Sequence, residues 1–170
     1  MSPGRRLVIG VGNPDAGDDA AGRLVARRLG VRNHCAAAEP HVIRECSGEA
    51  TALMEAWTGF DDVVLVDASH GAGAVGSVHR FEGVDLERLA GIEPRPRGST
   101  HGLGVWAAVA LARALRSLPC RLVIYAIEGR QFDAGGPLSP EVDHAVDELV
   151  ALLVQQQPVR AEPVNPAGET

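Results

Sequence analysis

Short runs of aliphatic residues alternate along the chain with longer segments in which apolar residues recur every three or four positions. The short runs are typical of buried strands, and the longer segments are typical of helices with one buried face. The predicted strands are Leu7–Ile9, His41–Cys46, Val63–Val66, Val78–Phe81 and Leu122–Ile127, of which Val78–Phe81 is short and peripheral. The predicted helices are Asp18–Leu29, Leu53–Trp57, Leu103–Leu115 and Pro140–Leu153. Strands that alternate with helices predict an α/β fold, a three-layer α/β/α sandwich around a largely parallel sheet.

The clearest helical periodicity lies between Leu103 and Leu115. It predicts a buried face made of Leu103, Trp106, Ala107, Ala110, Leu111, Ala114 and Leu115. The length of 170 residues suits one hydrophobic core, so we expect a single domain over residues 1–155. After Gln155 the chain holds three prolines and few apolar residues, which predicts a frayed tail over residues 156–170.

Composition and charge narrow the class of protein. All 16 basic residues are arginine, which excludes a phosphate-binding lysine and a Schiff-base lysine. The net charge of −6 argues against a nucleic-acid partner. Because no apolar run reaches about 18 residues, we expect no membrane span. The three cysteines are widely spaced and form no paired motif, so we expect a cytoplasmic protein without disulfides.

Three segments place polar side chains after predicted strands or at the start of helices. They are Gly10–Asp19, which contains the pair Asp18 and Asp19, Asp67 at the end of an aliphatic strand, and Ser99–Leu103, which contains His101. Each has an ordinary explanation: an aspartate that caps a helix, a carboxylate that reaches solvent, and a packed histidine. Helix capping explains one of the two adjacent aspartates and leaves the other unexplained. The acidic residues of the first segment also argue against a nucleotide phosphate there.

The functional crevice of such a sheet lies beyond the carboxyl ends of its strands. Asp19, Asp67 and His101 are all expected at that edge. Two carboxylates and one imidazole suit a divalent metal such as zinc or nickel, and three protein ligands leave positions open for water or substrate. His70, three residues after Asp67, is the rival third ligand. Cys46 follows a strand and is an alternative nucleophile, although a free cysteine is more often a small buried hydrophobe.

Several motifs in this order resemble the nickel–iron hydrogenase maturation endopeptidases. They are Gly10-x-Gly12-Asn13 with Asp18-Asp19 and Gly22, Val66-Asp67-Ala68, Ser99-x-His101-x-Leu103-Gly104, Gly129, and Leu138-Ser139-Pro140-Glu141-Val142. The resemblance extends from Arg6 to about Val154. It implies a five-stranded, twisted, mostly parallel sheet in which one strand, Val78–Phe81, is antiparallel.

The resemblance also implies the activity. Members of this family remove a C-terminal extension from the hydrogenase large-subunit precursor after nickel has been inserted. Their metal ligands correspond to Asp19, Asp67 and His101, which we expect to act in both metal recognition and catalysis. The nickel is then supplied by the precursor, and no organic cofactor is expected.

Two other classes of function are alternatives. One is a non-catalytic nickel-binding checkpoint or carrier in hydrogenase assembly, which leaves the length of the precursor unchanged. The other is a small-molecule α/β binding protein that uses the glycine-rich turn. We expect a monomer, because the exposed faces of the predicted helices are mainly polar.

Overall fold

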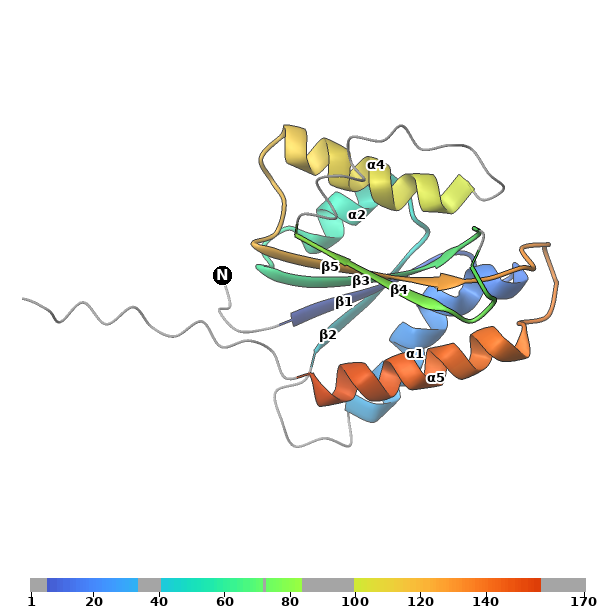
Figure 1. The fold of residues 1–170 in the computed structure, drawn as a ribbon. Coiled ribbons are helices and arrows are strands. Elements are labelled where there is room, and N and C mark those ends of the chain that lie inside the picture. Colours follow the sequence, from blue (N-terminus) through green and yellow to red (C-terminus); the bar gives the residue numbers. More distant parts are fainter. Residues whose placement is uncertain (1–5, 34–40, 72, 84–99, 157–170) are drawn as a thin grey trace, which may run out of the picture.

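The computed structural model describes residues 6–33, 41–71, 73–83 and 100–156, with residues 33 and 100–103 described by their backbone alone. Its strands are β1 (Arg6–Val11), β2 (Val42–Cys46), β3 (Asp62–Ser69), β4 (Val78–Glu82) and β5 (Arg121–Glu128). Its helices are the short 3₁₀ helix η1 (Gly17–Ala20), α1 (Ala21–Asn33), α2 (Ala50–Trp57), α4 (Thr100–Ala114) and α5 (Pro140–Gln155). Figure 1 shows α1 and α5 on one face of the sheet and α2 and α4 on the other, which confirms the predicted three-layer sandwich.

The sheet has the strand order β2-β1-β3-β5-β4. Neighbouring strands are parallel except β4, which pairs antiparallel with β5 and forms one edge. The expectation of one antiparallel strand at Val78–Phe81 is therefore confirmed. Because β1, β2, β3 and β5 run in the same direction, their carboxyl ends lie along one side of the sheet, on the right in Figure 1. We call this side the carboxyl edge and the opposite side the amino edge.

The aliphatic strands separate two hydrophobic cores because successive side chains point to opposite faces of a sheet. Val64 and Val66 of β3 pack toward α1 and α5, whereas Val63 and Leu65 pack toward α2 and α4. This alternation continues to Asp67, which therefore belongs to the face that α2 and α4 cover. The runs apolar on both faces are typical of parallel strands buried between two helix layers.

The buried face of α4 differs from the predicted one. Val105, Ala108, Val109 and Ala112 are fully buried against the sheet, whereas Ala107 and Leu111 are exposed. Leu115 lies beyond the end of the helix and is 62% exposed. The helix is apolar on almost every side, so periodicity alone does not select a face.

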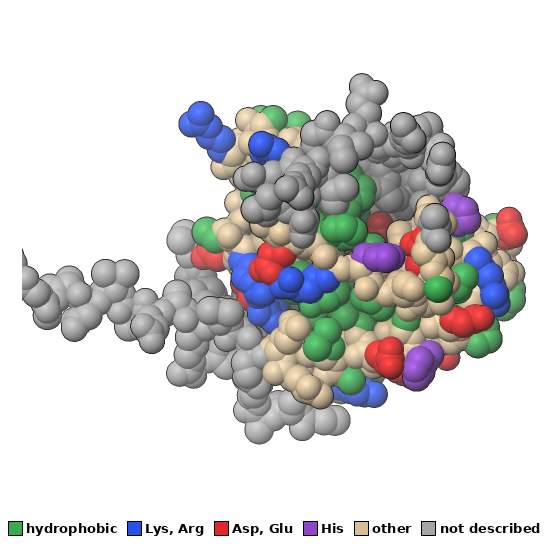
Figure 2. Space-filling view, in the orientation of Figure 1, with side chains coloured by type: hydrophobic (Ala, Val, Ile, Leu, Met, Phe, Trp, Pro, Cys, Tyr) green, Lys and Arg blue, Asp and Glu red, His purple; other side chains and the backbone are tan. Residues whose placement is uncertain are grey.

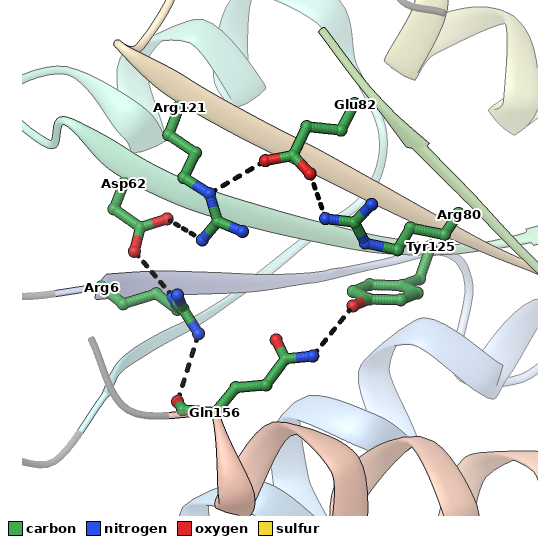
Figure 3. Close-up of polar contacts among 7 residues, drawn as sticks. All are labelled: Arg6, Asp62, Arg80, Glu82, Arg121, Tyr125 and Gln156. Carbon is green, nitrogen blue, oxygen red and sulfur yellow. Dashed lines mark hydrogen bonds and ion pairs between the residues drawn. The ribbon is translucent and has the colours of Figure 1, made fainter. Parts of the chain in front are cut away.

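Charged side chains close the amino edge (Figure 3). Arg6, which is almost completely buried, donates from Nε to Asp62 Oδ2 at 2.8 Å, and Arg121 bridges Asp62 and Glu82. Arg80 of β4 pairs with Glu82 and ends the series. In the space-filling view, blue and red side chains gather in one mixed cluster on the side where the amino ends of the strands lie (Figure 2). The series links β1, β3, β5 and β4 across the sheet.

Within the described ranges, no helix is long and apolar enough to cross a membrane. Helix α5 ends at Gln155, where the sequence predicts the domain to end. The predicted tail after Gln156 lies outside the described residues.

Candidate active site at the carboxyl edge

Glycine residues let the segment after β1 lie directly on the sheet. A Cβ atom at Gly22 would collide with the carbonyl oxygens of Val66 and Val11, so only glycine permits this approach of α1 to β1 and β3. Gly12 has φ +128°, a conformation that side chains disfavour, and a Cβ there would collide with the carbonyl oxygen of Asp19. These contacts hold η1 against the carboxyl edge and bring Asp19 beside β3.

Asp19 is a buried residue of η1, with 2% of its surface exposed. The backbone N–H of Asn13 donates to its Oδ2 at 2.8 Å, so the loop between β1 and η1 orients the carboxylate. The neighbouring Asp67 experiences the negative charge of Asp19. The structure therefore brings together two of the three residues that the sequence predicts at this site.

Asp67 lies inside β3 and not after it, because the strand continues to Ser69. The side chain is 4% exposed, and its Oδ1 accepts a hydrogen bond from the backbone N–H of Ala68 at 2.9 Å. Burial, and after it the negative charge of Asp19, raise the pKa of Asp67 to about 7, although the hydrogen bond from the Ala68 N–H opposes them. A carboxyl group with this pKa exchanges a proton near neutral pH, which suits a general base.

Asp18 has a different role from its neighbour. Its carboxylate is fully buried and accepts four hydrogen bonds: from the backbone N–H groups of Arg130, Gln131 and Ser139 and from the Ser139 hydroxyl. Burial alone would raise the pKa of Asp18, but these donors outweigh it and lower the pKa. The expectation that one aspartate caps the helix is wrong, because the N-cap of η1 is Ala16. Asp18 instead ties η1 to the loop between β5 and α5.

The third predicted residue, His101, belongs to the first turn of α4. The position of that turn follows from Gly104, where a Cβ would collide with the carbonyl oxygen of Gly48 in the loop after β2. Helix α4 thus begins at the carboxyl edge, as the sequence predicts. The side chain of His101 lies outside the described residues, so its approach to Asp19 and Asp67 stays a prediction.

His70 does not complete the site. Its exposed ring meets Phe132 edge-on, with the ring centroids 5.5 Å apart. Among the side chains that the structure describes, no three of His, Cys, Asp and Glu come close enough to hold a metal ion. Asp19, Asp67 and His70 are all described, so the rival ligand set with His70 is not formed. The two buried carboxylates alone still favour a cation, because a positive charge between them would relieve their repulsion.

Cys46 is half-buried, and burial raises the pKa of its thiol, so the reactive thiolate is disfavoured. This observation argues against a cysteine nucleophile. Glu128 also lies at this edge, although the predicted site does not include it. In the sequence it follows the apolar run Leu122–Ile127, just as Asp67 follows the apolar run Val63–Val66. Glu128 is 4% exposed, and the strand-end rule applied to β5 would have found it.

Comparisons with known proteins address the family and the fold of this chain. The model of a family described as HycI, hydrogenase maturation protease, matches residues 38–156. Among solved structures, the [NiFe] hydrogenase maturation protease HybD from Thermococcus kodakarensis is 25% identical, with a TM-score of 0.70, over 89% of this chain and 97% of that one. Among curated proteins no match was found.

Two further structures share the fold at lower identity. The [NiFe] hydrogenase maturation protease HycI from Thermococcus kodakarensis KOD1 is 22% identical, with a TM-score of 0.67, over 91% of this chain and 93% of that one. The hydrogenase maturating endopeptidase HybD from E. coli is 19% identical, with a TM-score of 0.65, over 88% of this chain and 89% of that one. At these identities the two structures support the fold alone.

Proposed function

Because the chain belongs to the hydrogenase maturation proteases and is therefore a hydrolase, we propose that it removes the C-terminal extension of a nickel–iron hydrogenase large-subunit precursor after nickel insertion. The observation that carries this proposal is the pair of Asp19 and Asp67. Both carboxylates are buried at the carboxyl edge, and the charge of one raises the pKa of the other. Such a pair is costly unless a cation or a proton offsets the charge.

In this proposal the cation is the nickel that the precursor already holds. The carboxylates of Asp19 and Asp67 bind it, and the imidazole of His101 supplies the third ligand from the first turn of α4. A precursor without nickel offers no positive charge to this pair and is not held. Cleavage therefore reports that nickel insertion is complete.

Water then hydrolyses the peptide bond. Either the nickel polarises this water or one carboxylate removes its proton, and the pair fits the second role because the pKa of Asp67 is about 7. Asp19 and Asp67 titrate as a coupled pair, so the proton belongs to the pair rather than to one residue. The protein needs no organic cofactor for this reaction.

The proposed function also specifies the partner and the compartment of the enzyme. Its partner is the hydrogenase large-subunit precursor in the cytoplasm, and it uses neither nucleic acid nor a membrane. It acts as a monomer, with the single domain of residues 1–155 carrying the whole site.

The test measures the mass of the precursor after incubation with the protein. Nickel-loaded precursor should lose its extension, and nickel-free precursor should stay intact. The variants Asp19→Asn, Asp67→Asn and His101→Ala should each abolish the mass change. Glu55→Gln, which alters an exposed carboxylate on α2, is the matched control and should cleave normally.

Two results would contradict the proposal. Full cleavage by all three site variants would remove these residues from the mechanism. An unchanged precursor mass together with nickel retained on the wild-type protein would assign the site to a carrier or checkpoint instead.

A further inference from the structure

Glu128 is a buried carboxylate that the proposed mechanism does not use. It ends β5 at the carboxyl edge and pairs in register with Ser69 of β3. Asp67 lies two residues before Ser69 on the same strand and pairs with Ala126. Since side chains two residues apart share a face, Glu128 and Asp67 belong to the same face and the same edge of the sheet.

The segment between β3 and β4 wraps around Glu128. We call residues 70, 71 and 73–77 the β3–β4 loop. The hydroxyl of Ser69 donates to Glu128 Oε2 at 2.5 Å, and the N–H of Gly73 donates to Oε1 at 3.3 Å. The backbone of Glu128 adds two bonds, accepting from the N–H of Gly76 at 2.7 Å and donating to the carbonyl of Ser77 at 2.9 Å.

The glycines of the loop make this wrapping tight. A Cβ at Gly71 would lie 2.5 Å from Glu128 Oε1, and one at Gly73 would lie 3.4 Å from Glu128 Cγ. The loop therefore follows the outline of the glutamate side chain closely. Because a buried charge needs hydrogen bonds to offset its lost hydration, the loop and the carboxylate depend on each other.

Glu128 is not a third member of the carboxylate pair. The groups that shift the pKa of Asp67 are its own burial, the charge of Asp19 and the Ala68 N–H, and Glu128 is not among them. Among the described side chains no three of His, Cys, Asp and Glu come close enough to share a metal ion, and the Glu128 carboxylate instead accepts from Ser69 and Gly73.

We propose that Glu128 is a positioning residue of the peptidase site, which holds the β3–β4 loop in place as the wall that the substrate peptide lies against next to Asp67. This inference rests on the proposed function. The loop begins at His70, three residues after Asp67, and it lies at the carboxyl edge (Figure 1), where the proposed function places the peptide. Without the carboxylate the loop loses the hydrogen bond from the Gly73 N–H, the end of β3 loses the one from the Ser69 hydroxyl, and the peptide loses a formed surface.

Two substitutions at Glu128 separate positioning from catalysis. In Glu128→Gln the amide oxygen accepts from Gly73 and the amide N–H donates to Ser69, so cleavage should match the wild type. In Glu128→Ala the KM for nickel-loaded precursor should rise about ten-fold, the effect of losing roughly 1.4 kcal/mol of binding, while kcat changes less than about three-fold. The pH profile of kcat should stay unchanged.

Other kinetic results would overturn the inference. A loss of kcat in both variants would make Glu128 a catalytic residue. An unchanged KM with a lowered fraction of active protein in Glu128→Ala would make its role merely structural. Glu55→Ala on the surface of α2 is the control for a lost carboxylate and should leave KM unchanged.

Amide hydrogen exchange in the free protein tests the same idea without any substrate. The N–H groups of Gly73 and Gly76 should exchange at least ten-fold faster in Glu128→Ala than in the wild type or Glu128→Gln, while the amides of β3 keep their protection. Equal exchange in Glu128→Ala and wild type would overturn the proposal. Faster exchange with no cleavage by the wild type would instead reject the proposed function and leave the loop contact established.

Discussion

The negative charge of Asp19 raises the pKa of Asp67, although the two residues belong to η1 and β3 and are distant in the sequence. The close approach of α1 to the sheet at Gly22 creates this coupling. Because both side chains are buried, water screens the repulsion between them only weakly in the folded state. The repulsion has measurable consequences for stability as well as for chemistry.

Asp67→Asn should stabilise the protein above neutral pH. The pKa of Asp67 is about 7 in the folded protein and 3.8 in the unfolded chain, so the folded state binds more protons between these values. The contribution of Asp67 to the free energy of unfolding therefore falls as pH rises from about 4 to about 7. At pH 8 the variant should gain on the order of 2–4 kcal/mol in free energy of unfolding, at about 1.4 kcal/mol per pKa unit.

Urea unfolding at pH 4, 6 and 8 measures this gain. It should be largest at pH 8 and smallest at pH 4, where the carboxyl group is protonated in the folded state and roughly half protonated in the unfolded chain. A gain independent of pH would mean that the charge of Asp67 does not cause it.

The adjacent aspartates should respond in opposite ways to the same substitution. Asp18→Asn replaces one acceptor oxygen by an N–H₂ group that faces a backbone donor, and we expect a loss of about 2–4 kcal/mol. Asp19→Asn keeps an oxygen for the Asn13 N–H and removes the repulsion on Asp67, so stability should hold or rise at pH 8. Thermal unfolding at pH 8 compares them, and equal losses in both variants would refute the division of roles.

Gly22→Ala should separate the carboxylate pair. The added methyl group meets the carbonyl oxygens of Val66 and Val11, which cannot move aside, so we expect a loss of about 3 kcal/mol. The pKa of Asp67 should fall as Asp19 moves away. NMR titration of the Asp67 carboxyl carbon measures that shift.

The control for this variant is Gly30→Ala on the same helix. A Cβ at Gly30 meets only the Ile43 Cδ1 atom at 3.7 Å, an ordinary contact, so the substitution should stabilise by up to about 1 kcal/mol. Equal effects of the two alanines would show that the approach at Gly22 is not tight.

His41 should have the opposite effect to Asp67 on the pH dependence of stability: its contribution to the free energy of unfolding should rise with pH. Burial lowers the pKa of His41, and Arg6 lowers it further, while the carbonyl of Leu153 and the charge of Asp62 oppose them. The unfolded chain therefore binds a proton more readily, and stability is lost as pH falls below about 6.5. His41→Gln, measured in the Asp67→Asn background, should flatten the rise between pH 5 and 7. An unchanged slope would exclude His41 as its source.

The sequence predicted the layers from local periodicity, and it predicted that Asp19 and Asp67 share the carboxyl edge from the direction of parallel strands. The antiparallel strand at Val78–Phe81 followed from the family resemblance and not from periodicity. It did not predict the partners of Asp18, which come from residues 130–139 and leave no local signal. It also gave the wrong face of α4, since a helix apolar all round has no preferred side until the sheet supplies one. The strand-end pattern that selects Asp67 also fits Glu128, but the contacts of Glu128 with Ser69 and Gly73 leave no local signal in the sequence.

The charged series at the amino edge has a consequence for how this molecule can change. Asp62 and Asp67 are five residues apart on β3, about 17 Å along a strand. No group of that series contributes to the pKa of Asp67. Heat resistance can therefore be adjusted at one end of the β-strands, by adding or removing arginine and carboxylate partners, while acidity at the other end stays as it is.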